Sequence, residues 1–136
     1  MRTWSLHSQK VYDRLDPRLQ KLVTRLRDEV ADITLVSGYR DRDEQEALFA
    51  ANATEKHWPD SKHNKLPSIA VDVQPYPYPT DPNHLWSGLG YIAGRAFGIA
   101  AEEGFSIRWG GDWDGDGDVT NQKFDDLFHL EILHDR

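Results

Sequence analysis

The sequence predicts one domain in which amphipathic helices accompany short β-strands. Apolar residues recur at helical spacing over residues 16–30 and 86–103, and they alternate with polar residues over 69–74 and 128–133. With 136 residues, the chain is long enough to bury a hydrophobic core. It contains no cysteine and therefore has no disulfide framework. We therefore expect a single domain over residues 1–136.

Composition excludes several classes of function. The formal net charge of −7 argues against a nucleic-acid partner, because phosphate binding depends on clustered Lys and Arg. Without cysteine, His and Asp or Glu remain as the metal ligands. The sequence contains no apolar run of signal-peptide or membrane-spanning length, so we expect a chain made in the cytoplasm without a signal peptide or membrane anchor. We also expect a monomer.

The first elements are helical. Residues 5–15 are expected to form a short helix. Asp16 then supplies an N-cap and Pro17 a first helical position for a second helix that continues to about Val30. A brief strand follows at residues 33–36.

A third helix is expected over residues 41–52. Asp41, with Glu44 three residues later, has the spacing of a capping box at its start. Arg40 directly precedes this helix and follows the strand, at a junction where mixed folds often hold ligands. Arg40 either contacts such a ligand or pairs with a nearby carboxylate.

Residues 61–75 contain the strongest functional signal. A polar start that includes His63 leads through Pro67 into a strand, in which Ile69, Val71 and Val73 alternate with Ala70, Asp72 and Gln74. This alternation predicts a half-buried strand. Asp72 stands between two valines, where a charge costs several kcal/mol unless a cation or hydrogen bonds compensate it. A metal ion shared with His63 would compensate it.

A proline- and tyrosine-rich loop and a long helix come next. Residues 76–82 either form one side of a groove or serve only as the connection between the strand and the helix. The helix over residues 86–103 contains Gly90, Gly94 and Gly98 at four-residue spacing, and we expect this ridge to pack closely against another element.

Two further strands, 105–109 and 128–133, complete the expected elements. The second of them places His129 and Glu131 on one face, three and five residues after Asp126. His63, Asp72 and His129 would supply three protein ligands and leave a fourth position for water, which is the arrangement of a catalytic zinc site.

The combination of motifs resembles a known family. SGYR at 37–40 with Gln45, SKH at 61–63, AVD at 70–72 and D-x-x-H-x-E at 126–131 occur in the family's order. They are similar to the zinc D-Ala-D-Ala carboxypeptidase and L-alanyl-D-glutamate endopeptidase family, in particular its phage endolysin branch. The resemblance extends from about Leu15 to Leu133.

The resemblance implies an α+β fold with a small, mainly antiparallel sheet, flanking helices and a zinc site on one sheet face. It implies that zinc is bound by His63, Asp72 and His129. It also implies that Asp126 is the catalytic carboxylate and that Arg40 holds the substrate and polarises the cleaved carbonyl. The residues implied to orient a ligand or the substrate are Ser61, Gln45 and Glu131.

The chain departs from the family pattern in two places. The segment between His63 and Asp72 is longer than usual and contains Pro67 but no glycine. Leu127 and Phe128 replace a pair that more often ends in proline.

The acidic segment 112–118 has the D-x-D-x-D-G pattern of a calcium loop, with carboxylates at Asp112, Asp114, Asp116 and Asp118. Position twelve of such a loop falls on Lys123 or Asp125, depending on the frame, and neither frame is complete. The segment is either a solvated acidic turn or a site for calcium acting as a regulatory ion.

The expected function is a zinc metallopeptidase that hydrolyses the L-Ala-D-Glu bond of peptidoglycan stem peptides as a phage endolysin. Such an enzyme would have no separate cell-wall-binding domain, and it would act on periplasmic peptidoglycan after release by a holin. One alternative is a D,D-carboxypeptidase or D-Ala-D-Ala dipeptidase. A second alternative is a calcium-dependent binding module without catalysis.

Overall fold

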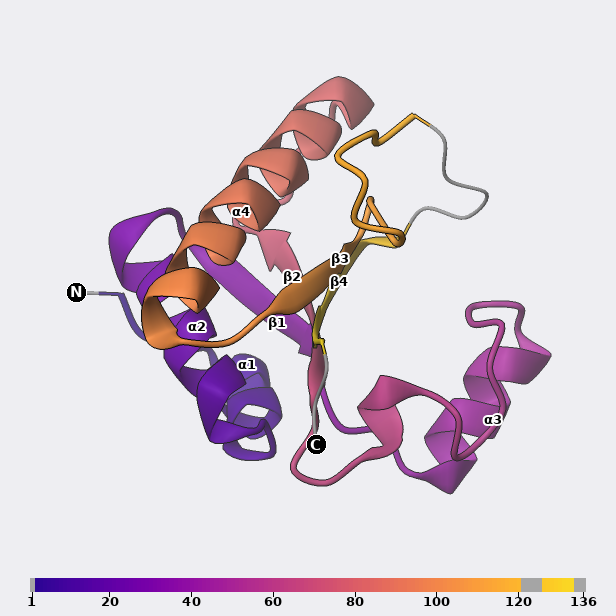
Figure 1. Ribbon diagram of the computed structural model, residues 1–136. Helices are drawn as coiled ribbons and strands as arrows, with labels where there is room; N and C mark the ends of the chain where they lie inside the picture. The colour runs from indigo at the N-terminus through magenta and orange to yellow at the C-terminus, as the bar shows by residue number, and fades with distance from the viewer. Residues whose placement is uncertain (1, 121–125, 134–136) are drawn as a thin grey trace.

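The computed structural model describes residues 2–120 and 126–133. Within these ranges the chain forms helices around a four-stranded sheet (Figure 1). The elements, in chain order, are α1 (Leu6–Asp13), α2 (Pro17–Glu29), β1 (Ile33–Ser37), α3 (Arg42–Ala50), the short 3-10 helix η1 (Lys62–Asn64), β2 (Ala70–Pro75), α4 (Pro82–Glu103), β3 (Ile107–Gly110) and β4 (Asp126–Ile132).

The sheet has the strand order β1-β2-β4-β3, and each neighbouring pair is antiparallel. Together with the helices, this sheet confirms the expected α+β fold. The register places Asp72 of β2 directly opposite His129 of β4. Directly opposed residues of antiparallel strands have their Cβ atoms about 5 Å apart, so the two side chains meet on one face of the sheet.

The core lies between the sheet and the pair α2 and α4, on the side opposite α3 (Figure 1). Helix α2 buries one apolar stripe, and α4 packs against both α2 and the central strands. The core includes Leu19, Leu22, Val23, Leu26, Leu35, Val71, Val73, Ile92, Ala96, Ile99, Leu130 and Ile132. This packing leaves the other face of β2 and β4 for the polar residues of the site.

Helix α4 begins at Pro82, four residues before the predicted start at Trp86. The Asp81 side chain accepts a hydrogen bond from the Asn83 N–H and caps the helix, and Pro82 fits the first position because its missing N–H would have no helical partner there. The helix ends as predicted at Gly104, which has a φ of 86°.

The prediction that the glycine ridge packs closely is wrong. A Cβ built on Gly90, Gly94 or Gly98 would meet nothing within 4 Å, and Gly94 and Gly98 are exposed. The buried face of α4 instead carries Ile92 and Ile99, since burying a large aliphatic side chain contributes about 1.5–3 kcal/mol and glycine offers no such gain.

Strand β2 is buried more completely than the predicted half-buried strand. Residues 70–73 are all buried, and Asp72 is 8% exposed. Its second face is covered because η1 packs against β2. Asp72 is therefore a buried charge that needs partners.

Candidate metal centre and adjoining pocket

Three side chains converge on the polar face of the sheet. His63 comes from η1, Asp72 from the middle of β2 and His129 from the middle of β4. The His63 Nε2 atom lies 3.2 Å from His129 Nδ1 and 3.3 Å from Asp72 Oδ1. The remaining side of the triangle, from His129 Nδ1 to Asp72 Oδ1, is also 3.3 Å. These three residues form a group that could hold a metal ion.

The triangle has the dimensions of a tetrahedral metal site. An ion with bonds of about 2.0–2.1 Å in tetrahedral geometry separates its ligands by about 3.3–3.4 Å. Two imidazole nitrogens and one carboxylate oxygen are donors that suit zinc, and the described residues add no softer ligand. The donor set therefore fits the metal that the sequence predicts.

Hydrogen bonds on the far side of each imidazole fix its orientation. His63 Nδ1 lies 2.7 Å from the Gly38 carbonyl oxygen, and His129 Nε2 lies 2.8 Å from Glu131 Oε1. Both partners are acceptors, so each of these nitrogens donates, and the tautomers are assigned on this basis. When both imidazoles are neutral, the lone pairs of His63 Nε2 and His129 Nδ1 therefore face the centre.

The electrostatics of the centre favour a bound cation. Burial raises the pKa of Asp72, but the neighbouring His63 and His129 outweigh it and hold that pKa well below its usual range. Burial lowers the pKa of His129, whereas its hydrogen bonds to Asp72 and Glu131 raise it to about 9. The metal-free centre thus holds a proton that a metal ion would replace.

Arg40 pairs with the outer oxygen of Asp72. One guanidinium nitrogen lies 3.0 Å from Asp72 Oδ2, and Arg40 Nε donates to Ser37 Oγ at 3.1 Å. The Arg40 backbone N–H also donates to the His63 carbonyl at 2.8 Å. The loop that follows β1 is therefore bound to both the metal-facing strand and η1, and Arg40 still lines the pocket.

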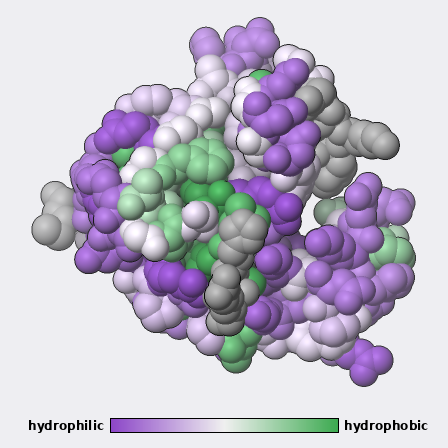
Figure 2. Space-filling model, in the orientation of Figure 1, coloured by the Kyte–Doolittle hydropathy of each residue, from purple (hydrophilic) through white to green (hydrophobic). Residues whose placement is uncertain are grey.

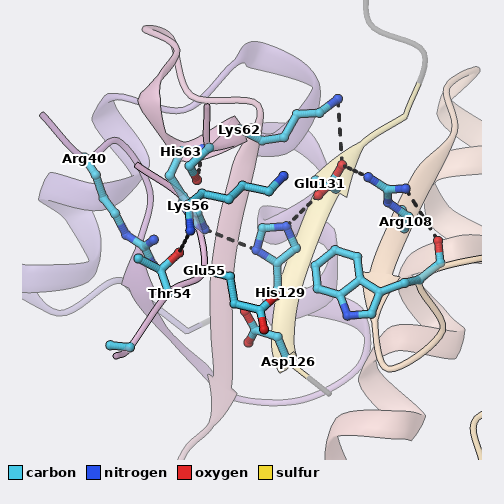
Figure 3. A pocket seen from close by; sticks show the side chains of 13 residues that line it. Arg40, Thr54, Glu55, Lys56, Lys62, His63, Arg108, Asp126, His129 and Glu131 are labelled. Carbon is cyan, nitrogen blue, oxygen red and sulfur yellow. Dashed lines mark hydrogen bonds and ion pairs between the residues drawn. The ribbon is translucent and has the colours of Figure 1, made fainter. Parts of the chain in front are cut away.

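A pocket of about 350 Å³ adjoins this centre, and His63 and His129 line it (Figure 3). The space-filling view shows the molecule hollowed between the α3 segment and the sheet, with hydrophilic residues on both sides (Figure 2). The lining residues come from the loop after β1, the loop after α3, η1 and its cap, β3, the acidic segment and β4. They are Arg40, Ala53, Thr54, Glu55, Lys56, Ser61, Lys62, His63, Arg108, Trp113, Asp126, His129 and Glu131.

Asp126 is the first residue of β4 and lines this pocket. Burial raises the pKa of the Asp126 carboxyl, and the negative charge of Asp72 raises it further. Gly110 pairs with Asp126 at a register shift, and a Cβ on Gly110 would lie 2.0 Å from the Asp126 carbonyl oxygen. Only glycine allows this approach, so Gly110 determines where Asp126 is placed.

Two basic residues that the sequence did not reveal hold Glu131. Arg108 lies opposite Glu131 on β3 and donates to Glu131 Oε2 at 3.0 Å, while Lys62 Nζ lies 3.7 Å from the same oxygen. Burial raises the pKa of Glu131, but His129 and then Arg108 lower it to about 2. Their positions depend on the β3–β4 register, for which the sequence carries no local signal.

Gln45 and Ser61 both position backbone near the centre. Gln45 is fully buried and is absent from the pocket lining, and its amide donates to the Lys56 carbonyl at 2.7 Å and accepts from Asn64 Nδ2 at 3.1 Å. Ser61 lines the pocket and caps η1, because its hydroxyl accepts from the His63 N–H at 3.2 Å.

The acidic segment brings Asp112, Asp114 and Asp116 together as a second group that could hold a metal ion. Burial raises the pKa of Asp112, and the neighbouring Asp114 and Asp116 raise it further. Asp118 lies outside this group, and its carboxylate accepts from the Thr120 hydroxyl at 2.6 Å. Lys123 and Asp125, named above for position twelve, lie outside the described residues.

The acidic segment also contacts the metal centre. The Trp113 ring lies 5.3 Å from the His129 ring, measured between centroids, and the Arg108 guanidinium carbon lies 5.4 Å from the centroid of the Trp113 ring.

In the part of the chain that the structure describes, no helix combines the length and apolar character needed to span a membrane.

Comparisons with known proteins agree with this geometry. A sequence model of the family described as "Phage L-alanyl-D-glutamate peptidase" matches residues 2–133. Among solved structures, the chain is similar to the crystal structure of Serratia marcescens L-Ala D-Glu endopeptidase ChiX, with a TM-score of 0.69 and 21% sequence identity. This similarity covers 96% of the present chain and 89% of the other, and at this identity it shows the fold. A search of curated proteins gives no significant match.

Proposed function

Because the chain belongs to the phage L-alanyl-D-glutamate peptidase family, we propose that it is a zinc metallopeptidase that cleaves the L-Ala-D-Glu bond of peptidoglycan stem peptides. The observation that carries this proposal is the triangle of His63, Asp72 and His129, with sides of 3.2–3.3 Å, whose two imidazoles line a pocket. These three residues would hold the zinc ion. When bound there, zinc would supply Lewis acidity, which makes water a stronger acid and a carbonyl a better electrophile.

Asp126 is the proposed proton carrier. It lines the same pocket, and its raised pKa brings the carboxyl closer to the pH at which it must both accept and release a proton. Asp126 would take a proton from the attacking water and pass it to the nitrogen of D-glutamate as the amide bond breaks.

Arg40 has two proposed tasks. Its bond to Asp72 Oδ2 holds that carboxylate with its other oxygen turned toward the imidazoles. A guanidinium carries five N–H groups, so others remain available on the pocket side to bind the oxygen of the cleaved carbonyl.

Metal content and product analysis test the proposal together. Purified protein is expected to contain close to one zinc ion per chain, and His63→Ala is expected to lose it. Mass spectrometry of digested muropeptides should show stem peptides freed from muramyl-L-alanine. Release of terminal D-alanine would instead indicate the carboxypeptidase or dipeptidase alternative.

A matched pair of variants tests catalysis. Asp126→Ala should abolish cleavage, whereas Asp60→Ala, at an exposed position outside the pocket lining, should retain it. If the zinc-loaded wild-type protein binds peptidoglycan but cleaves neither bond, the chain is a binding module and the peptidase proposal is wrong.

We also propose that Asp112, Asp114 and Asp116 bind a calcium ion. In support, their carboxylates cluster, and the buried Asp112 Oδ1 atom has no hydrogen-bond partner among the described residues. A cation would relieve the repulsion among the three carboxylates. Because Trp113 lies in this segment and contacts His129, the ion would also stabilise one wall of the pocket.

The proposed biological role is that of a phage endolysin that acts as a monomer on periplasmic peptidoglycan after release by a holin. Co-expression with a holin should lyse a bacterial host, while expression of either protein alone should not. Lysis without the holin would contradict this route of release.

A further inference from the structure

The pocket is rich in cations although the chain as a whole is acidic. The net charge is −7, yet four basic side chains among the described residues line the pocket: Arg40, Lys56, Lys62 and Arg108. Three of them are engaged by buried carboxylates. Arg40 pairs with Asp72 at 3.0 Å, and Arg108 and Lys62 pair with Glu131 at 3.0 and 3.7 Å.

Lys56 is the cation left over. Among the described residues, no hydrogen bond or ion pair engages its ammonium group. Figure 3 shows its side chain extending from the loop after α3 into the pocket, on the side of His129. A positive charge that faces a peptide-binding pocket without a protein partner is available to a carboxylate of the substrate.

The backbone that carries Lys56 is fixed relative to the metal centre. Buried Gln45 donates to the Lys56 carbonyl and accepts from Asn64, the residue after His63. The next residues are also bound, because the Trp58 N–H donates to Glu46 Oε1 at 2.7 Å. The wall of the pocket that carries Lys56 is thus connected through one buried side chain to the segment that carries His63.

The proposed substrate has a carboxylate in a suitable place. D-Glutamate has two carboxyl groups, and the peptidoglycan stem continues through the γ-carboxyl. The α-carboxylate therefore remains free, two bonds from the nitrogen of the cleaved amide. Any substrate whose L-Ala carbonyl lies at the metal centre brings this charge into the pocket.

We propose that Lys56 binds the free α-carboxylate of D-glutamate and makes the enzyme selective for stems in which this group is not amidated. The inference rests on the proposed function and adds a residue that determines specificity. Glu55, the preceding residue, also lines the pocket, and its negative charge opposes a substrate carboxylate. The two neighbours therefore affect binding of that group in opposite directions.

The test compares two synthetic muramyl peptides that differ only at this group, one with the α-carboxylate and one with an α-carboxamide. Wild type should cleave the carboxylate form with a kcat/KM about tenfold or more higher, the effect of one charge-assisted hydrogen bond. Lys56→Met should lower the ratio of the two values to about one, and Lys56→Arg should restore most of it. Lys10→Met, at an exposed position on α1 outside the pocket lining, should leave the ratio unchanged.

Three outcomes overturn the inference. Lys56→Met could keep the wild-type ratio, wild type could cleave both peptides equally, or Glu55→Gln could lower the preference for the carboxylate form. Failure of the proposed function is separate and visible first, because wild type would then cleave neither peptide.

Discussion

Replacing Gln45 by leucine tests whether one buried amide connects the pocket wall to the metal centre. Gln45 is fully buried and makes two short hydrogen bonds, to the Lys56 carbonyl at 2.7 Å and from Asn64 Nδ2 at 3.1 Å. Leucine fills a similar volume and removes both.

The expected loss of stability follows from what each partner retains. A buried polar group left without a partner costs about 1–3 kcal/mol. Asn64 Nδ2 keeps a bond to the Arg40 carbonyl at 3.2 Å, and the exposed Lys56 can recover part of its loss by binding water. We therefore expect Gln45→Leu to lower the free energy of unfolding by about 2 kcal/mol, below the sum of two full penalties.

Urea denaturation of the metal-free protein measures this change without a contribution from zinc binding. Gln9→Leu is the control, because the Gln9 amide bonds Asp13 at 2.8 Å on an exposed surface and its loss should cost less than about 0.5 kcal/mol. The substrate preference assigned to Lys56 should also weaken in Gln45→Leu. A Gln45→Leu protein as stable as the Gln9 control, with an unchanged preference, would refute the argument.

Three further perturbations have expected outcomes. Gly110→Ala should lower kcat/KM at least about 100-fold, because its Cβ would lie 2.0 Å from the Asp126 carbonyl oxygen and would displace the proposed proton carrier. Gly94→Ala, with open space around it, should leave kcat/KM unchanged and should be neutral for stability or stabilise by up to about 1 kcal/mol, and equal effects of the two changes would contradict the argument. The pKa of Asp126 is raised, so its ionised, proton-accepting form is lost at a pH above the ordinary aspartate pKa of about 3.9. A pH profile of kcat/KM, with zinc content checked at each pH, should therefore begin to decline on the acid side before the pH falls to about 3.9. Terbium, which replaces calcium, should show emission sensitised by Trp113 that Asp114→Asn abolishes, and a wild-type protein without such emission would argue against the cation site.

Local patterns predicted most of the elements for identifiable reasons. Asp16 with Pro17 and Asp41 with Glu44 occupy the predicted caps, since such caps depend only on nearest neighbours in the chain. Asp81 caps α4 in the same way as Asp16 caps α2. This cap was missed because the whole proline-rich segment 76–82, which includes Asp81 and Pro82, was assigned to a loop.

In the predicted site, too, some features could be recognised from the sequence and others could not. His63, Asp72 and His129 were predicted as a metal site because the chemistry of such a site restricts its ligands to few residue types, and the structure brings the three together. Gln45 was expected near substrate or ligand, and its buried bonds to the wall of the pocket were not predictable from spacing. The direction faced by the glycines of α4 was also unpredictable, because four-residue spacing defines a ridge but not the side on which it lies.

The charges around His129 explain why several basic residues were needed and why one remains available. His129 lies between two buried carboxylates, those of Asp72 and Glu131, and a buried carboxylate without a cation is strongly destabilising. Arg40 neutralises the first, and Arg108 with Lys62 the second. These two carboxylates therefore engage three of the four basic side chains that line the pocket among the described residues, and in our proposal the fourth, Lys56, binds the carboxylate of the stem peptide. Replacing Arg40 or Arg108 should consequently weaken metal retention, while replacing Lys56 should change the choice of substrate and leave the zinc content intact.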